Sequence, residues 1–350
     1  MAVQVAIIGA GLTGLSIARA LQAKGVSYSL IEARDRLGGR ILTEHWGLAG
    51  FDLGPSWFWP GQPRMAALLE SLGLEVFEQF AEGALLYETE QGEVVRDRGF
   101  SSMQGSLRIR GGMGALVAGT AKELPEEVLH VGRPVVSVSQ SGLVGLADGH
   151  VISADVVVVA VPPRVAAGIS FDPALPPSQT DALRAIPTWM AGHAKCVAVY
   201  DRPFWRARGL SGDAMSRIGP MVEIHDASTD DYGALFGFLG VPPEVRAKQA
   251  DAVKAACAAQ FVRLFGEDAG APVTVFYTDW ATQPETATAG DLTPLTHHPT
   301  YGRPAPMFPK ADNAIYFAAT ELATDMGGFL EGALSAAEDA VTWVEQRLTS

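Results

Sequence analysis

A glycine-rich turn near the start of the chain constrains the fold more than any other feature of the sequence. It follows a continuous apolar run, Val3 to Ile8, which is typical of a strand covered on both faces in a parallel sheet. Gly9, Gly11 and Gly14 then form the pattern G-x-G-x-x-G. A helical stretch and a second strand, Ser27 to Ile31, complete a βαβ unit. The sequence therefore predicts an α/β fold with a dinucleotide-binding turn.

Each glycine of this turn has a physical reason. Gly9 permits a tight turn, Gly11 lets the backbone approach a pyrophosphate, and Gly14 lets the helix pack closely on the strand. Leu12 and Thr13 lie in the same turn, where the N–H groups and the positive end of the helix dipole attract an anion. We predict that all five residues contact the cofactor.

An acidic residue closes the second strand. Glu32 lies 18 residues after the last glycine of the turn, placed to bind ribose hydroxyls, and its charge would repel the 2′-phosphate of NADP. The alternative is an unrelated carboxylate beside a glycine-rich turn. Glu32, Ala33, Arg34, Gly39 and Arg40 belong to the pattern E-A-x-x-x-x-G-G-R, which resembles the flavoprotein extension of the motif. In such proteins the arginine meets phosphate or flavin, so the resemblance implies FAD.

The remaining chain carries further motifs in a fixed order. They are Phe51–Trp57, Arg110–Leu116, Arg133–Val135, Ala160–Pro163, Lys195–Trp205 and Ala319–Ala333. With these motifs the sequence resembles the flavin-containing amine oxidases, the superfamily of monoamine and polyamine oxidases. The resemblance extends over the whole chain and is specific for the family, but much less specific for the substrate.

The resemblance implies an α/β fold with a Rossmann-type FAD-binding domain and an inserted, reduced α+β substrate-binding domain. The predicted FAD-binding domain is discontinuous and covers 1–79, 104–190 and 310–350. The substrate-binding domain covers 80–103 and 191–309. Only about 30 residues separate Gln79 from Arg110, where larger relatives carry a helical part of the substrate domain. We therefore expect an open substrate pocket.

Apolar patterning places further elements along the chain. Two long helices are expected at Pro243–Phe265 and Phe329–Leu348. Strands are expected at Val135–Val138, Val156–Val161, Lys195–Tyr200, Ala234–Leu239, Val273–Thr278 and Ala314–Ala318.

The resemblance also assigns cofactor-binding residues outside the first motif. A helix that begins near Gly328 would direct its N–H groups at the flavin pyrimidine ring, where negative charge develops on reduction. Both cysteines lie outside the segment Trp280 to Tyr301, in which monoamine oxidases attach flavin covalently, so we predict non-covalent FAD. The additional predicted FAD contacts are Gly54, Pro55, Ser56, Trp57, Val135, Trp280, Glu321, Gly328, Phe329 and Leu330.

Lys195 is the candidate catalytic residue. By resemblance it holds a water at flavin N5; the alternative is a structural lysine whose stem lies along the core while its head reaches water. The substrate-binding prediction comprises Trp57, Tyr301 and Phe329, the last two as an aromatic cage. No ligand pattern of carboxylates or cysteines accompanies His297 and His298, so we predict no metal site.

The implied reaction is oxidation of a small-molecule amine. A neutral amine gives hydride to flavin N5, the imine is hydrolysed, and O2 re-oxidises the flavin to give H2O2. Two alternatives remain open. One is a flavin dehydrogenase or desaturase of the same superfamily that acts on C–C or C–O bonds or uses an acceptor other than O2. The other is a non-enzymatic flavin-binding protein.

The composition of the chain limits the kinds of molecule that it can bind. The formal net charge of −13 disfavours nucleic acid and anionic lipid as partners. The longest strongly apolar run, Val156 to Val161, is too short to span a membrane, and the N-terminus reads as a strand rather than a leader, so we expect a cytoplasmic protein. The sequence does not identify the amine or the oligomeric state.

Overall fold

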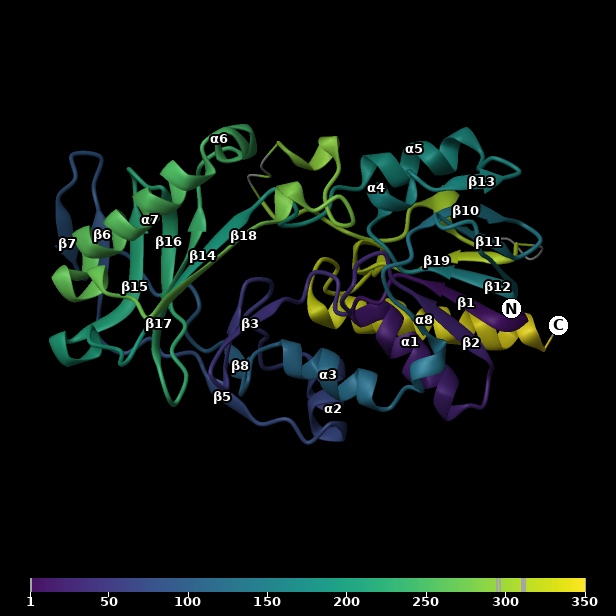
Figure 1. The fold of residues 1–350 in the computed structure, drawn as a ribbon, viewed down its shortest axis with the longest axis horizontal. Coiled ribbons are helices and arrows are strands. Elements are labelled where there is room, and N and C mark those ends of the chain that lie inside the picture. Colours follow the sequence, from purple (N-terminus) through teal and green to yellow (C-terminus); the bar gives the residue numbers. More distant parts are fainter. Residues whose placement is uncertain (1, 294, 296, 310–312, 350) are drawn as a thin grey trace.

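The chain forms a mixed α/β fold with two large sheets at opposite ends of an elongated molecule (Figure 1). The computed structural model describes residues 2–293, 295, 297–309 and 313–349. The chain passes from the first sheet to the second and back twice, because β6 and β7, and later β14 to β18, belong to the second sheet. Among the described residues, no helix combines the length and the apolar character needed to cross a bilayer.

The first sheet has a parallel centre in the order β9–β2–β1–β12–β19. An antiparallel extension, β11 and β10, joins β12, and β13 pairs with β10. The strand bounds are β1 Ala2–Ile8, β2 Tyr28–Ile31, β9 Leu129–His130, β10 Val135–Ser139, β11 Leu143–Leu146, β12 Val151–Val159, β13 Ser170–Asp172 and β19 Ile315–Phe317.

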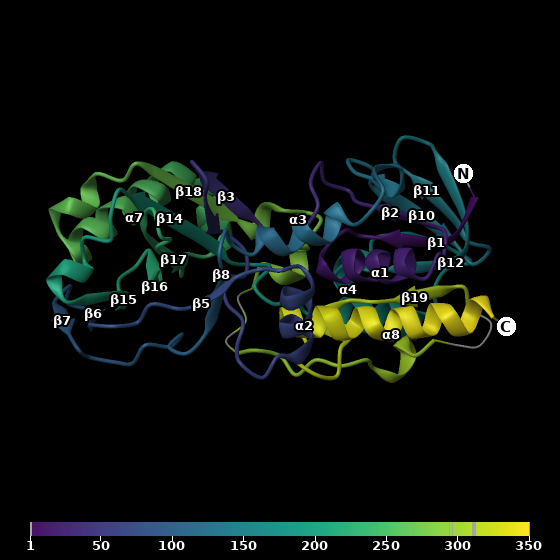
Figure 2. The ribbon, with the colours of Figure 1, turned by 90° about the horizontal axis from the view of Figure 1, so that it is seen from below.

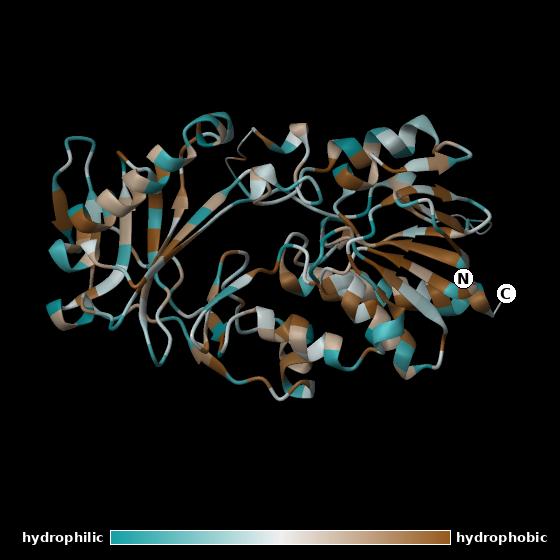
Figure 3. Cartoon of the chain, viewed as in Figure 1, coloured by the Kyte–Doolittle hydropathy of each residue, from teal (hydrophilic) through white to brown (hydrophobic). Residues whose placement is uncertain are grey.

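The continuous apolar run of β1 is explained by burial on both sides. Val5 and Ile7 pack into a cluster with α1 and α8, whereas Ala6 and Ile8 pack on the opposite side with residues of α4 and α5. The central strands are accordingly hydrophobic along their length (Figure 3), and Figure 2 shows α8 running along the first sheet toward α2. The helix bounds are α1 Leu12–Ala23, α2 Pro63–Ser71, α3 Gly114–Lys122, α4 Pro163–Ala166, α5 Pro177–Ala185 and α8 Leu330–Leu348.

The second sheet has the order β18–β14–β17–β16–β15–β6–β7 and is antiparallel except for the pair β15–β6. Its bounds are β6 Ala84–Glu88, β7 Val94–Arg96, β14 Ala194–Tyr200, β15 Leu210–Ser216, β16 Met221–Asp226, β17 Gly233–Leu239 and β18 Thr274–Asp279.

The two faces of the second sheet have different partners. Cys196 and Tyr200 share a core cluster with Phe261 of α7 (Ala250–Phe265) on one face. On the other face, Val197 and Phe236 pack with residues of the first 60 positions of the chain. Two small sheets complete this junction: β3 (Thr43–Trp46) with β4 (Ala49–Asp52), and β5 (Val76–Glu78) with β8 (Leu107–Ile109).

The strands expected from the sequence are confirmed with small changes at their ends, except that β12 begins at Val151 rather than Val156, and the continuous helix predicted over Pro243–Phe265 is wrong. The backbone leaves the helical region at Gln249, where φ is −132° and ψ is 35°, and the chain forms α6 (Pro243–Lys248) and α7. The Arg246 guanidinium ties α6 to the second sheet through the Asp279 carboxylate and the Gly192 carbonyl, which explains why α6 does not continue into α7.

The close packing at the glycine turn predicts that a larger residue at Gly14 lowers the stability of the protein. A Cβ atom at Gly14 would lie 1.9 Å from the carbonyl oxygen of Gly9, so Gly14→Ala forces α1 away from β1. We expect the free energy of unfolding to fall by about 1–3 kcal/mol, measured by urea denaturation. Gly270→Ala is the control, since its Cβ would meet Val262 at an ordinary 3.4 Å. Equal losses of unfolding free energy in both variants would contradict the close packing of α1 on β1.

Candidate active site

The turn between β1 and α1 leaves backbone N–H groups available to bind an anion. Gly11 is the N-cap of α1 and no side chain caps the helix, so its first N–H groups are not occupied by a capping side chain. A Cβ at Gly11 would meet only the Cα of Gly39, at 4.0 Å. Leu12 and Thr13 begin the helix, and the Thr13 hydroxyl donates to the Ala333 carbonyl of α8 at 3.0 Å. The turn is thus joined to the C-terminal helix.

Glu32 lies buried at the end of β2. Its carboxylate accepts hydrogen bonds from the backbone N–H groups of Ala10 (2.8 Å) and Arg34 (3.0 Å). These bonds hold the carboxylate against the glycine turn. Ala33 follows directly, and the Arg34 guanidinium donates to the Thr286 hydroxyl at 2.8 Å. The segment after β2 is therefore fixed by contacts at both ends.

Arg40 forms a bidentate ion pair with the fully buried carboxylate of Glu321, with N–O distances of 2.6 and 3.2 Å. Burial lowers the pKa of Arg40, but the charge and hydrogen bonds of Glu321, together with the nearby Tyr301 and Asp291, raise it above its usual value. The sequence predicts separate cofactor contacts for these two residues, whereas the structure joins them to each other. Gly54 lies against the same arginine, because a Cβ there would approach the Arg40 carbonyl to 2.1 Å.

Helix α8 begins one residue later than the sequence suggests, at Leu330. Phe329 is the N-cap, and no side chain caps the helix. The Thr320 hydroxyl accepts from the Gly328 N–H at 2.9 Å and donates to the Phe329 carbonyl at 2.8 Å. Gly328 has a φ of +84°, a backbone conformation that favours glycine. The positive end of α8 is thus held in place by the Thr320 hydroxyl and has no side-chain cap.

Lys195 lies on the face of the second sheet that points to the junction. Its side chain is almost completely buried, and Nζ donates to the Ser56 hydroxyl at 2.6 Å and to the Gly54 carbonyl at 3.2 Å. The ring of Phe236 lies 3.8 Å from Nζ. Burial lowers the pKa of Lys195 to about 7, so the ammonium loses its proton near neutral pH. The head of this lysine does not reach solvent, and Pro55 lies between its two partners.

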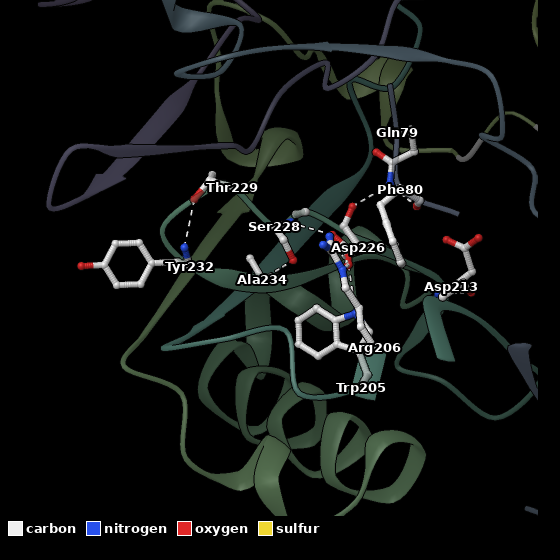
Figure 4. Close-up of polar contacts among 12 residues, drawn as sticks. Gln79, Phe80, Trp205, Arg206, Asp213, Asp226, Ser228, Thr229, Tyr232 and Ala234 are labelled. Atoms are coloured by element: carbon white, nitrogen blue, oxygen red, sulfur yellow. Dashed lines mark hydrogen bonds and ion pairs between the residues drawn. The ribbon is translucent and has the colours of Figure 1, made fainter. Parts of the chain in front are cut away.

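Trp57 is anchored by a polar network that crosses the junction. Its indole N–H donates to Gln79 at 2.8 Å, and the Gln79 amide donates to the Asp226 carbonyl at 2.8 Å. The Asp226 carboxylate accepts from Trp205 and Arg206 (Figure 4). The Trp57 ring is thereby held over the second sheet.

Trp280 and Val135, which are also predicted to contact the cofactor, lie in different parts of the structure. The buried indole of Trp280 donates to the Leu53 carbonyl at 2.9 Å and so supports the segment that leads to Gly54. Val135 is the first residue of β10 in the first sheet and is half-buried.

The rings of Tyr301 and Phe329 both pack on His298. The centroid distances are 5.4 Å for Tyr301 and 4.8 Å for the nearly parallel Phe329. The Tyr301 hydroxyl donates to the Pro187 carbonyl, and burial raises its pKa. The sequence interpretation gave His298 no role beside these rings. In the part of the chain that the structure describes, no group of three or more potential ligands could hold a metal ion.

Sequence reasoning missed a polar cluster near Trp57. The His225 ring lies 5.0 Å from the Trp57 ring and between the carboxylates of Asp213 and Glu223, at 3.0 and 3.1 Å. Burial lowers the pKa of His225, but the two carboxylates outweigh it and raise the pKa. These residues lie on β15 and β16, which the sequence analysis did not identify, so no expected element placed them near the site.

The chain belongs to the family described as flavin containing amine oxidoreductase, whose model matches residues 12–99 and 76–344. The predicted family, FAD as the cofactor and amine oxidase as the activity are thereby confirmed. The two matched ranges overlap over residues 76–99.

Similar proteins cover nearly the whole chain. Putrescine oxidase of Kocuria rosea is 25% identical over 456 positions, covering 94% of this chain and 92% of the relative. The flavin-containing amine oxidase B of Sus scrofa is also 25% identical, with 96% and 85% covered. The structure of putrescine oxidase bound to putrescine has a TM-score of 0.82 at 24% identity, with 99% of each chain covered. Cyclohexylamine oxidase of Brevibacterium oxydans IH-35A has a TM-score of 0.81 at 20% identity, with 99% and 100% covered.

Burial of Lys195 predicts a pH-dependent effect on stability. The pKa is about 7 in the folded chain and 10.5 ordinarily, so between these values the unfolded chain binds a proton that the folded chain does not. Relative to Lys195→Met, the wild type should therefore gain about 2 kcal/mol of unfolding free energy between about pH 7 and pH 9, and the difference should level off below pH 7.

Urea denaturation at several pH values measures this difference. The exposed Lys248→Met on α6 is the control and should show no such slope. If the difference in unfolding free energy between the wild type and Lys195→Met does not change with pH, the Lys195 ammonium is solvated.

Proposed function

We propose that Lys195 acts at the reacting centre of this FAD-dependent amine oxidase. The burial of the Lys195 ammonium against Gly54 and Ser56 carries this proposal. It brings a titratable group of the second sheet onto a segment that the family resemblance assigns to the flavin. A structural lysine with its head in water would not have these contacts.

The residues around the first sheet fit FAD. The open backbone at Gly11 and the uncapped start of α1 suit a pyrophosphate, and the uncapped start of α8 suits the electron-rich end of the flavin. We propose a Rossmann-type FAD-binding domain made of 1–79, 104–190 and 310–350, and a substrate-binding domain made of 80–103 and 191–309. FAD is held without a covalent bond, since both cysteines are buried on β14 and α7.

Individual residues have distinct roles in this proposal. Glu32 accepts ribose hydroxyls, and the Arg40–Glu321 pair presents an arginine of fixed orientation to the cofactor. The other proposed cofactor contacts remain those named from the sequence. When FAD is bound, its flavin supplies the hydride acceptor. Lys195 holds a water through Nζ, and its lowered pKa limits repulsion of an approaching substrate.

The relatives support an amine as substrate, because their names specify putrescine and cyclohexylamine. We propose O2 as the electron acceptor. The rings of Trp57, Phe329 and Tyr301 exclude water and orient the amine, with His298 packed between Phe329 and Tyr301 as a further ring of the site.

Anaerobic titration tests the function. We expect the purified protein to contain FAD that acid precipitation releases into the supernatant, and we expect amines to bleach its absorbance without O2. Admission of O2 should restore the absorbance and produce H2O2. Bleaching without re-oxidation by O2 would indicate another acceptor. Flavin that no amine in a diverse panel bleaches would contradict the proposed activity.

Lys195→Met tests the role of Lys195. Methionine has a similar volume, so FAD should remain bound. Below pH 7, re-oxidation by O2 should slow at least about tenfold, because protonated Lys195 supplies a positive charge that stabilises the charge developing on oxygen. Reduction by the amine should change less. Stopped-flow measurement of both half-reactions, with Lys248→Met as the control, separates these effects. Re-oxidation at the wild-type rate would mean that Lys195 does not act on O2.

A further inference from the structure

One imidazole nitrogen in the candidate active site is buried without a partner. This atom is Nε2 of His298, which makes no hydrogen bond with any residue that the structure describes. A buried polar atom without a partner destabilises a folded protein, so folded proteins seldom keep one unless a ligand or a water satisfies it. Nε2 of His298 therefore marks a place where a ligand atom fits the protein.

The start of α8 leaves room for this imidazole. A Cβ atom at Gly328 would lie 2.8 Å from Nε2 of His298, so the ring lies directly against the backbone. Helix α8 has no side-chain cap at this end, and this is the end that we propose to face the flavin. The free nitrogen thus belongs to the proposed reaction site.

Aromatic rings surround the imidazole on its other sides. Phe329 stacks on it at a centroid distance of 4.8 Å, with 20° between the ring planes. Trp189 and Tyr301 meet it nearly edge to face, at 4.9 and 5.4 Å. None of these ring contacts supplies a hydrogen-bond acceptor, and an aromatic face tolerates both a neutral ring and a cation against it. The surroundings therefore suit an imidazole that changes its charge.

The charged groups near the imidazole are already paired with one another. Glu321, Arg40 and Asp291 act on the neighbouring phenol of Tyr301. Arg40 neutralises Glu321, and Arg164 neutralises Asp291. The phenol itself stays neutral, because burial raises its pKa. Among the described residues, no ion pair therefore holds the imidazole in one protonation state.

The oxidation of an amine needs a proton acceptor in this site. A primary amine has a pKa of about 10, as a lysine side chain does, so it arrives near neutral pH as an ammonium without a free electron pair. Lys195 is bonded to the Gly54 carbonyl and the Ser56 hydroxyl, and His225 lies between two carboxylates. In the tautomer with its proton on Nδ1, His298 offers a lone pair on Nε2.

We propose that His298 is a catalytic residue that takes the proton from the substrate ammonium. This inference rests on the proposed function, because Phe329 and Tyr301 mark the substrate site. An N–H bond of the ammonium breaks, its electron pair stays on the amine nitrogen, and the proton bonds to Nε2. The neutral amine then donates hydride. Reduction of O2 to H2O2 later consumes protons, which returns the imidazole to its neutral form.

The pH dependence of flavin reduction tests this role on the FAD-loaded protein. An amine that reduces the wild-type flavin is mixed anaerobically at limiting concentration with the wild type and with His298→Phe. Without a proton acceptor, only amine that is already neutral in solution reacts, and this fraction falls tenfold per pH unit below about pH 10. We therefore expect reduction of His298→Phe to be at least about tenfold slower than wild type at pH 7.5, but within about twofold at pH 10.

Two further variants separate proton transfer from packing. His298→Gln keeps a hydrogen-bonding side chain that cannot take up a proton, so it should lose the same factor at pH 7.5 as His298→Phe, which keeps an aromatic ring. His45→Phe places the same substitution on an exposed position of β3 and should match the wild type at both pH values. FAD content reports whether each variant is folded, and either His298 variant alone is sufficient for the test.

The outcomes distinguish this inference from the function on which it rests. If the His298 variants slow flavin reduction by the same factor at pH 7.5 and pH 10, or do not slow it, His298 only packs in the site, and amine oxidation stands without it. If no amine reduces the flavin of the wild type at either pH, the function proposed above fails and the role of His298 fails with it.

Discussion

Lys195, a buried residue of the second sheet, connects the two parts of the molecule, because its hydrogen-bond acceptors lie on the segment after β4. Removing an ammonium from water costs several kcal/mol unless hydrogen-bond acceptors replace the water. Gly54 and Ser56 supply those acceptors to Lys195, and the Phe236 ring adds a favourable cation–π contact. Gly54 in turn lies against Arg40, which is paired with a buried carboxylate of the C-terminal region. The lysine is therefore satisfied only when both parts of the molecule are assembled.

Local sequence was sufficient to predict β1, β2, β10, β12 and β19 of the first sheet, whereas β9, β11 and β13 were not expected. The apolar run of β1, the glycine turn and the acidic end of β2 are contiguous features whose geometry follows from short-range sterics and hydrogen bonding. Motif matches also predicted the family and the cofactor. The position of Lys195 on a buried strand was predicted correctly, because its neighbours in β14 are mostly apolar.

The structural features that the sequence did not predict depend on contacts between residues far apart in the chain. The pairing of Arg40 with Glu321 joins positions 281 residues apart, and no local pattern specifies it. The contact of His225 with Trp57 joins β16 to the segment after β4, and β16 was not expected from the sequence. The interruption of the predicted helix at Gln249 depends on an ion pair between Arg246 and β18. Propensity and periodicity describe single elements and contain no information about such partners.

The hydrogen bond between Thr13 and Ala333 has a consequence for biosynthesis. The first residues of α1 and the first turns of α8 form one unit, although 320 residues separate them. A chain emerging from the ribosome makes its dinucleotide turn almost at once, but it cannot complete the packing around that turn until translation reaches α8. Assembly of the holoprotein is therefore a late event, and until then the apolar face of α1 that packs on α8 in the folded protein is open to chaperones.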